Sequence, residues 1–532
     1  MSEAYTAEER AALAPYFTSL DGPVFALVNL PEVVKGALFA RYSRSSKPLR
    51  RLFLDEFLGR DVTVPCATAA DGAPGAGLAR AEQLYERVFV EYGDDSVAQL
   101  GGVHLACEGA SNVLTKVLEW GRLMAYLEQS TRYVPYDDRP GGRYRYHVPR
   151  ELEGALRERY VATLDRAFDT YVAWLPRLRD FYAARFPRAE GDSEPVHRTS
   201  IRAKALDTLR GLLPAATVSN VGIFGTGQGY EQLLLRMRAH PLAEVRWYAD
   251  QMLAELRKVI PAFLRRVDVP DRGGAWSAYL AETRAAVEAQ AARLLAGVEA
   301  ERRDEVTLTD FDPDGETKVV AAALYAASTL PDDQLLALVR KMSHAERVAV
   351  LHAYVGRRGN RRHKPGRAFE RTAYRFDVLA DYGAFRDLQR HRLLTLEWQS
   401  LTPRHGWVMP AAVEEAGAGP DWARVMDESA ALHDAVAAAG LPHVAGYAVS
   451  MAYRVRFYME MNAREAMHVI ELRSAPSGHP AYRGIVQAMH RLIAERAGHP
   501  AIAAAMLFAD HADVALERLA AERAAERRRP RS

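Results

Sequence analysis

The 532-residue sequence has only two cysteines, no long apolar run and almost no net charge, and each absence excludes a class of protein. Cys66 and Cys107 are too few for a disulfide framework and show no paired metal-ligand spacing, which predicts a reducing, cytoplasmic location. No stretch reaches the roughly 18 apolar residues of a membrane span, and the first residues carry acids rather than the apolar core of a signal peptide. The 70 Lys and Arg residues nearly balance 68 Asp and Glu residues, which argues against a protein that coats nucleic acid by bulk charge.

The rest of the composition is that of an ordinary globular protein, with 49% hydrophobic and 26% charged residues. Its length predicts at least two domains. Apolar residues recur at three- and four-residue spacing over 151–186, 278–300 and 501–527, which predicts helices. Alternation over Thr372–Val378 predicts a strand.

Three segments predict breaks between these elements. Residues 187–197 and 409–421 read as loops, and residues 302–316 read as a connection after a long polar helix. We therefore place the main boundary near residue 303, with residues 1–302 as the first domain, including a helical end at 275–302, and residues 303–532 as the second.

The two halves share three faint matches in the same order, which indicates an internal duplication. The matched pairs are Ala37–Ser43 with Ala323–Ser328, Glu119–Ser130 with Gln389–Ser400, and Leu235–Arg246 with Leu472–Arg483. The alternative is chance similarity between two halves rich in Ala, Leu and Arg.

The sharpest chemical signal is Arg390-His391-Arg392, followed after seven residues by Ser400. Two guanidinium groups beside an imidazole suit a phosphate or an electron-rich heterocycle, because arginine offers a planar fork of donors to anionic oxygens. The alternative is a solvated helix face that carries these cations.

This Arg-His-Arg-x7-Ser pattern resembles the signature of the flavin-dependent thymidylate synthases. His363–Val378 resembles that family's His-rich turn and Glu before a strand, and Asn462–Arg473 resembles its helix from Asn-Ala-Arg to Leu-Arg. Two positions depart from the family: His468 replaces a second Asn, and Trp398 replaces the acid before Ser400.

The first half resembles the same family through different residues. Glu128–Tyr133 looks like its Glu-x-Ser-x-Arg-Tyr motif, and Arg210–Pro214 looks like its Arg-x-x-Leu-Pro segment. In the second half Gly446 takes the place of Arg210, and in the first half Trp120-Gly121-Arg122 takes the place of Arg-His-Arg. The losses are complementary, so one half keeps the flavin-type residues and the other the nucleotide-type residues.

The resemblance implies an α+β protein with two copies of the flavin-dependent thymidylate synthase fold, each rich in helix with a small central sheet. It implies FAD as cofactor, NADPH and methylenetetrahydrofolate as co-substrates, and methylation of dUMP to dTMP. The family's homotetramer implies a homodimer of this tandem chain that forms a pseudo-tetramer. Partners are then small molecules, without nucleic acid, membrane or metal.

The resemblance also assigns roles to individual residues. It assigns FAD binding to Arg390, His391, Arg392, Glu370 and Asn462. It assigns dUMP binding to Glu128, Ser130, Arg132, Arg210 and Arg473, and a catalytic part to Arg132, Ser130 and Ser400.

Other interpretations stay open at this point. Each half lacks part of the motif, so the chain could be a catalytically degenerate flavin- or nucleotide-binding homologue, or could modify another pyrimidine nucleotide. The eight basic residues within 357–375 could contact nucleic acid or form a solvated surface. Gly225–Gly229 lacks the full dinucleotide-loop spacing and has no clear buried strand before it, so we interpret it as a turn before a helix at 228–239.

Overall fold

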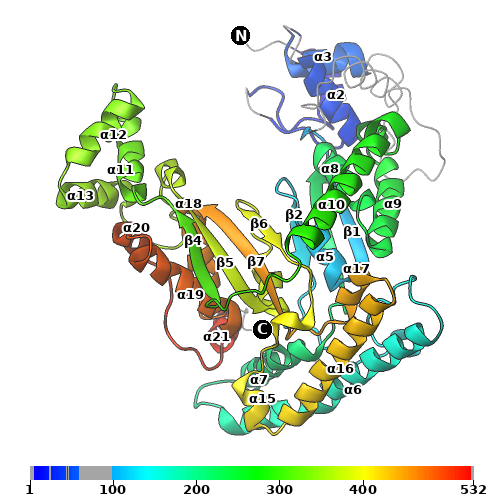
Figure 1. The fold of residues 1–532 in the computed structure, drawn as a ribbon. Coiled ribbons are helices and arrows are strands. Elements are labelled where there is room, and N and C mark those ends of the chain that lie inside the picture. The colour runs from blue at the N-terminus through cyan, green and yellow to red at the C-terminus, as the bar shows by residue number, and fades with distance from the viewer. Residues whose placement is uncertain (1–4, 23–24, 43–44, 46, 59–98, 529–532) are drawn as a thin grey trace. The chain divides into compact units, whose positions relative to one another are not determined.

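The computed structural model describes residues 5–22, 25–42, 45, 47–58 and 99–528, and Cys66 lies outside them. The chain forms two compact units (Figure 1). Unit 1 comprises residues 1–108, 123–128 and 220–298, and unit 2 comprises residues 109–122, 129–219 and 299–532. Among the described residues, no helix has the length and apolar character that crossing a membrane requires. The predicted boundary near residue 303 concerns the repeats and stays a prediction.

Each repeat contributes one small sheet. The first sheet has the order β1-β3-β2, formed by β1 (Gly102–Ser111), β2 (Ala125–Glu128) and β3 (Val218–Thr226). The second has the order β4-β5-β7-β6, formed by β4 (Val306–Phe311), β5 (Ala373–Asp381), β6 (Thr395–Trp398) and β7 (Arg454–Asn462). Its neighbouring strands are all antiparallel. The strand predicted at Thr372–Val378 is β5, whose alternate residues are buried.

Helices make up most of the described chain. Those of unit 1 are α1 (Ala7–Leu13), α2 (Glu32–Tyr42), α3 (Leu49–Phe53), α8 (Gly227–Arg238), α9 (Ala243–Arg257) and α10 (Ala275–Leu294). Those of unit 2 are α5 (Asn112–Leu118), α6 (Gly154–Arg185), α7 (Glu194–Leu209), α11 (Gly315–Tyr325), α12 (Asp332–Lys341), α13 (His344–Val355), α14 (Tyr382–Leu388), α15 (Ala411–Glu415), α16 (Gly419–Ala438), α17 (Pro442–Ala445), α18 (Ala463–Arg473), α19 (Pro480–Glu495), α20 (Pro500–Ala504) and α21 (Leu519–Arg528). The α+β prediction is therefore confirmed.

The predicted duplication is visible in the element bounds. Strands β2 and β6 correspond at a separation of 270 residues, as the match between Glu119–Ser130 and Gln389–Ser400 predicts, and helices α5 and α14 just before that match keep the same separation. Strand β3 corresponds to β7 at a separation of 236 residues, and the same separation relates the 3-10 turns at Arg210–Leu212 and Gly446–Ala448. Gly446 thus occupies the structural position of Arg210 in the second repeat.

Segments of the two repeats pair within unit 2 around an approximate two-fold axis. The backbone N–H of Ala215 donates to the carbonyl of Val449, and that of Met451 donates to the carbonyl of Leu213, both at 2.8 Å. Ala215 and Met451 are equivalent positions in the two repeats, as are Leu213 and Val449, so the two bonds are related by the duplication. An isolated bridge between Pro214 and Ser450 lies at their centre.

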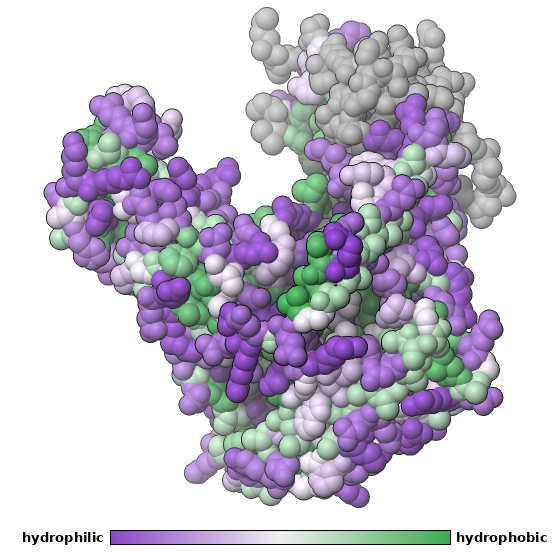
Figure 2. All heavy atoms as spheres, viewed as in Figure 1, coloured by the Kyte–Doolittle hydropathy of each residue, from purple (hydrophilic) through white to green (hydrophobic). Residues whose placement is uncertain are grey.

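The core of unit 2 also draws on both repeats. Tyr171 and Leu209 from the first repeat belong to the same buried cluster as Phe376 and Met459 from the second. Helices α6 and α16 pack against each other (Figure 1). Hydrophilic residues predominate on the face seen in Figure 2, including the surface of α11–α13.

Three sequence predictions about this region were wrong in part. Residues 302–316 are not only a connection, because Val306–Phe311 forms strand β4 against β5. The loop at 409–421 contains α15 and the start of α16, and the loop at 187–197 ends at α7, whose N-cap is Ser193. Proline contributes to these starts, because it fits the first turn of a helix, where its missing N–H is not needed.

The helix predicted over 501–527 is interrupted between α20 and α21. Asp510 accepts from the backbone N–H of its neighbour Ala512, and its own N–H donates to Ser474 Oγ. Arg483 holds the same turn through Asp510 and the carbonyl of Ala512. Tertiary contacts to α18 and α19 therefore override the helical periodicity.

Two remaining predictions lie in unit 1. The helix predicted at 228–239 is α8, which Thr226 caps, but a strand that the sequence analysis did not recognise, β3 with its alternate residues buried, leads directly into it. Cys107 is buried and free, and burial raises the pKa of its thiol to about 12, as suits a packed apolar group.

Candidate active site

The Arg-His-Arg triplet lies directly after the short helix α14. Asp381 caps this helix by accepting from the Ala384 N–H at 2.9 Å, and Phe385 and Leu388 anchor it in the core. The triplet therefore leaves a buried element, and its three side chains take different directions: His391 is buried, Arg390 is one-third exposed and Arg392 is exposed.

Asp387, which the sequence analysis missed, is surrounded by four arginines from both repeats. Arg210 Nη1 lies 3.3 Å from its carboxylate and Arg390 Nη1 lies 3.9 Å away. Burial acts to raise the pKa of Asp387, but Arg390, Arg210, Arg473 and Arg132 together hold it well below its usual range. This Asp387 cluster, defined as Asp387 with those four arginines, brings together four of the predicted site residues.

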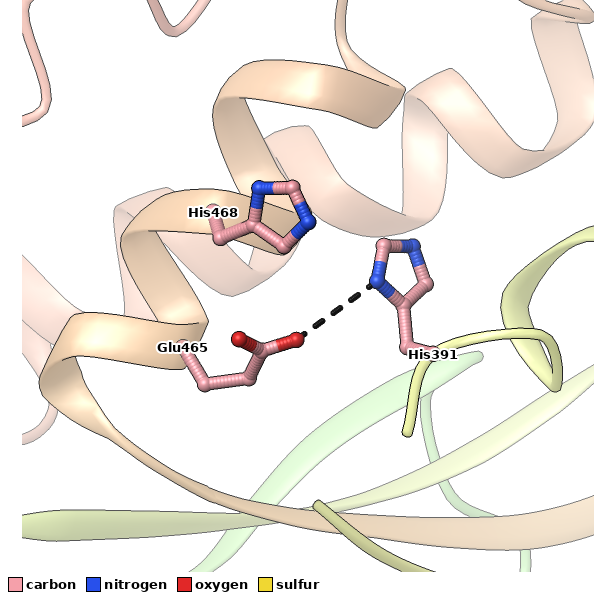
Figure 3. Close-up of side chains that lie close together, drawn as sticks. All are labelled: His391, Glu465 and His468. Atoms are coloured by element: carbon pink, nitrogen blue, oxygen red, sulfur yellow. Dashed lines mark ion pairs between the residues drawn. The ribbon is translucent and has the colours of Figure 1, made fainter. Parts of the chain in front are cut away.

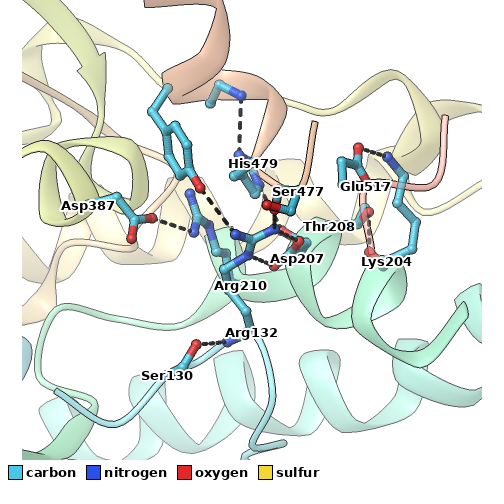
Figure 4. A network of polar contacts seen from close by, with 12 residues as sticks. Ser130, Arg132, Lys204, Asp207, Thr208, Arg210, Asp387, Ser477, His479 and Glu517 are labelled. Atoms are coloured by element: carbon cyan, nitrogen blue, oxygen red, sulfur yellow. Dashed lines mark hydrogen bonds and ion pairs between the residues drawn. The ribbon is translucent and has the colours of Figure 1, made fainter. Parts of the chain in front are cut away.

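Arg132 is held in place by a second acid that the sequence analysis missed. Its Nε and Nη2 donate to the two oxygens of Asp207 at 2.7 and 2.6 Å, and its Nη1 donates to Tyr482 at 3.2 Å (Figure 4). The nearby Asp207 raises the pKa of Arg132 despite its burial. Ser130 Oγ accepts from the Arg132 backbone N–H at 3.2 Å, so the Ser-x-Arg spacing forms a local turn.

Arg210 is buried, and one nitrogen of its guanidinium group is not engaged in a hydrogen bond within the described chain. Its Nη2 has no hydrogen-bond partner among the described residues, and it lies 4.0 Å from Asp381. Gly383 makes this placement possible, because a Cβ there would lie 2.9 Å from Arg210 Nε and 3.0 Å from Nη2.

His391 joins the Arg-His-Arg triplet to helix α18. Arg473 Nε donates to His391 Nε2 at 2.9 Å, so the histidine proton resides on Nδ1, which lies 3.6 Å from Glu465 Oε1. His468 completes a group in which the nearest ligating atoms lie within 4.8 Å of one another (Figure 3). Burial lowers the pKa of both histidines, that of His468 to about 4.

Two histidines and a glutamate can bind zinc or a similar ion. Here the surrounding charges oppose a cation, since Arg473 occupies His391 Nε2, and Lys364 and Arg464 act on the same group electrostatically. The arrangement suits an anionic or electron-rich ligand better than a divalent metal.

The remaining predicted residues lie on other elements, and none of their contacts within the described chain reaches the Asp387 cluster. Asn462 caps α18 by accepting from the Glu465 N–H at 2.9 Å, and Glu370 lies 3.6 Å from Arg464 on the same first turn. Ser400 is exposed after β6, and no hydrogen bond or ion pair of the described chain joins it to the Asp387 cluster. Glu128 is buried at the end of β2, in unit 1.

The basic run within 357–375 is largely built into the fold. Arg358 is buried against Glu471, with both oxygens at 2.6 Å, and Arg375 pairs with Glu460 at 2.9 Å. Arg367 bonds Glu370 at 3.0 Å. These contacts leave fewer cations to form a nucleic-acid surface.

Comparison with known proteins decides the family. The family model described as thymidylate synthase complementing protein matches residues 56–262 and again residues 307–499. The chain belongs to this family. Its two matches correspond to the two repeats, so the resemblance and the tandem duplication seen in the sequence are confirmed.

Relatives of similar length align with almost the whole of this chain. A UPF0159 protein of Chlamydia pneumoniae is 38% identical over 521 residues, 97% of each chain. One of Chlamydia muridarum is 37% identical over 524 residues, and one of Thermoplasma acidophilum is 30% identical over 515 residues, covering 92% of this chain and 97% of its own. The names of these relatives do not state an activity.

Proposed function

We propose that this member of the thymidylate synthase complementing protein family is an FAD-dependent thymidylate synthase, which methylates dUMP to dTMP with methylenetetrahydrofolate as carbon donor and NADPH as reductant. The observation that carries the proposal is the Asp387 cluster. Arginines that each repeat retains separately, Arg132 and Arg210 from one and Arg390 and Arg473 from the other, surround a single point. Guanidinium groups in a desolvated site bind phosphate strongly, as dUMP requires.

The residues present also fit an FAD. The buried imidazole of His391 lies among cationic side chains, where Lys364, Arg464 and Arg473 outnumber the acids Glu370 and Glu465. Arg390, His391, Arg392, Glu370 and Asn462 would hold the cofactor, which supplies hydride-transfer chemistry when bound. The chain's own contribution is then to orient the two ligands and to offset their charge.

Each residue that we propose to bind dUMP has a distinct role. Arg210, whose Nη2 makes no hydrogen bond to the described residues, and Arg473 provide charge for the phosphate, while Ser130 offers a polar contact to the nucleotide. Arg132 is fixed by Asp207 and presents a positioned guanidinium edge. Ser400 would act from the exposed segment after β6.

A first test uses the purified protein directly. We expect flavin absorbance in the isolated protein and NADPH oxidation that dUMP stimulates, with dTMP formed from dUMP and methylenetetrahydrofolate. Arg390→Ala and Arg132→Ala should each abolish useful turnover, because removing one partner of a buried charged contact costs about 2–5 kcal/mol. Normal flavin content and turnover in Arg390→Ala would refute the assignment.

One observation favours a second candidate, a related protein with an altered nucleotide or no turnover. Asp387, Asp381 and Asp207 neutralise much of the arginine charge that a phosphate dianion would use. If flavin is present and dUMP has no effect on NADPH oxidation, titration with other pyrimidine nucleotides distinguishes an altered substrate from lost catalysis.

A further inference from the structure

The first repeat carries a counterpart of the Arg-His-Arg triplet in which most of the residues assigned to the flavin are lost. At the 270-residue separation, the segment Glu119–Arg122 corresponds to Gln389–Arg392, with Gly121 in place of His391. Glycine has no imidazole to offer, and Trp120 stands where the second repeat has an arginine. Both segments belong to unit 2, so the contacts between them are defined.

Two side chains of Glu119–Arg122 bind strand β6, which follows the triplet in the second repeat. Trp120 Nε1 donates to the carbonyl of Leu396 at 3.2 Å, and Arg122 Nη2 donates to Thr395 Oγ1 at 3.1 Å. The Trp120 ring also meets the Trp398 ring edge-on, with the ring centroids 5.9 Å apart. The first repeat therefore holds the strand that leads away from the triplet.

The carbonyl of Leu396 faces the open edge of its sheet. Strand β6 lies at that edge, beside β7 (Figure 1). The backbone N–H of Gln399 donates to the carbonyl of Arg456 in β7, and the backbone groups of an antiparallel strand alternate between its two sides. The Leu396 carbonyl therefore points away from β7 and needs a donor from outside the sheet, which Trp120 supplies.

Glu119 acts on the triplet itself. Its side chain is fully buried, and its Oε2 accepts from Lys116 Nζ at 2.6 Å and lies 3.9 Å from Arg390 Nε. Two carboxylates, one from each repeat, flank Arg390, because its Nη1 lies 3.9 Å from Asp387. Gln389 Nε2 joins the two segments by donating to the carbonyl of Lys116 at 3.1 Å. Opposite charges interact strongly in a buried setting, so Glu119 restricts where the Arg390 guanidinium group can lie.

We propose that Glu119, Trp120 and Arg122 are positioning residues, which hold the Arg-His-Arg triplet of the second repeat in place for FAD rather than bind a flavin themselves. This inference rests on the proposed function in naming FAD as the ligand. The three side chains are engaged by the second repeat, so they are not available to a second cofactor. One chain should therefore bind one equivalent of FAD, although it carries two copies of the fold.

The main test titrates flavin-free protein with FAD and compares Trp120→Phe with the wild type. We expect one equivalent to bind to the wild type, and about fivefold weaker binding in Trp120→Phe, because the ring remains but the hydrogen bond to β6 is lost. Trp276→Phe makes the same change to an exposed indole of α10 and should bind FAD as the wild type does. A merely structural role of Trp120 would lower the unfolding temperature and leave the affinity for FAD unchanged.

A double-mutant cycle of unfolding in urea tests Glu119 without any ligand. Glu119→Gln should raise the unfolding equilibrium constant about fivefold less in the Arg390→Gln background than in the wild type, because the partner there is already neutral. The contact of Glu119 with Lys116 is present in both backgrounds and cancels. Arg340→Gln, at an exposed arginine that pairs with Asp314, is the control background and should give additive effects.

Three results would each overturn the proposal: an unchanged affinity for FAD in Trp120→Phe, two equivalents of FAD per chain, or additive effects of Glu119→Gln and Arg390→Gln. If the wild type binds no FAD, the proposed function fails, and the unfolding cycle alone decides whether Glu119 positions Arg390. If Glu119→Gln does not fold, the stoichiometry of the wild type and the affinity of Trp120→Phe decide.

Discussion

At the scale of single residues, the main finding is that acids accompany three of the arginines that the sequence singled out, with Asp207 beside Arg132 and Asp387 beside Arg210 and Arg390. Asp387 lies three residues before Arg390, and Asp207 lies three residues before Arg210, each within or at the end of the same helical segment. The spacing places Asp387 near Arg390, whereas Asp207 pairs with Arg132, which is distant in the sequence. An arginine motif read alone therefore overstates the positive charge that a substrate meets.

Asp387 competes with the phosphate of any nucleotide that binds the Asp387 cluster. We expect Asp387→Asn to tighten dUMP binding severalfold, because the neutral amide leaves the guanidinium charge of Arg210 and Arg390 to the ligand. The same change should lower the free energy of unfolding of the unliganded protein by about 3–5 kcal/mol, because buried arginines lose their counter-ion.

Isothermal titration with dUMP and thermal unfolding check both effects. Asp377→Asn serves as control, because Asp377 also pairs with an arginine, Arg456 at 2.7 Å, but lies half-exposed in β5. Weaker dUMP binding in Asp387→Asn would indicate that the carboxylate helps to position the arginines rather than compete with the ligand.

His468 links stability to pH. Burial lowers its pKa from 6.5 to about 4 in the folded protein, so the unfolded chain takes up the proton first as the pH falls. Its stabilising effect is complete above pH 6.5 and is lost between pH 6.5 and about 4. We therefore expect the unfolding midpoint in urea to fall over this range, and to fall less steeply in His468→Asn.

The comparison must be made against the wild type, because Glu465 has a raised pKa and acts in the opposite direction. His352→Asn, which changes an exposed histidine of α13, is the matched histidine-to-asparagine control for folding and expression. Parallel profiles for wild type and His468→Asn would show that His468 does not couple to folding.

At the scale of elements, helix α14 positions the candidate site, and Gly383 in its first turn is the sensitive point. Gly383→Ala would press a Cβ against the Arg210 guanidinium and against Asp381, whose Oδ1 lies 2.9 Å from the added atom. We expect dUMP binding to weaken at least tenfold, because Arg210 must leave its place beside Asp387.

Gly484→Ala in α19 is the matched control. No atom lies within 4 Å of a Cβ at that position, and alanine favours a helix interior over glycine by about 1 kcal/mol, so this variant should be as stable as the wild type or more so. If Gly383→Ala binds dUMP normally, Arg210 does not need its observed position.

Sequence reasoning located elements better than it located contacts. The match of Glu119–Ser130 with Gln389–Ser400 correctly paired the segments that contain β2 and β6, because the motif spacing is kept in both repeats. Strand β4 was missed because six residues next to a polar loop carry too short an alternation to predict. The pairing of Arg132 with Asp207 joins residues 75 positions apart, and such long-range partners leave no local signal in a single sequence.

At the scale of the whole molecule, the repeats are interdependent. Residues 129–219 come from the first repeat yet belong to the same compact unit as residues 299–532. The four backbone bonds around Pro214 and Ser450, including those from Ala216 to Tyr447 and from Ala452 to Gly211, extend one pairing across both. A single chain thus builds internally an isologous contact of the kind that two identical subunits form.

The shared core predicts how the two halves of the chain behave when they are expressed separately. Residues 1–302 and 303–532, expressed apart, should each fail to fold, because each exposes a face of the shared core that holds Tyr171 and Leu209 with Phe376 and Met459. Co-expressed, they should purify as one complex, since the peptide between them is an exposed connection and contributes no core residue. A tag on one fragment, followed by thermal unfolding of the complex, measures both effects.

Gly211→Ala and Gly222→Ala make the co-expression experiment specific to the two-fold contact. A Cβ at Gly211 would collide with Trp422 of the other repeat, whereas the nearest atom to a Cβ at Gly222 lies 3.8 Å away. Gly211→Ala should reduce recovery of the complex and Gly222→Ala should not. Light scattering of the intact chain then tests the proposed pseudo-tetramer: we expect twice the 59.1 kDa of one chain, and an active monomer would show that one chain completes its own sites.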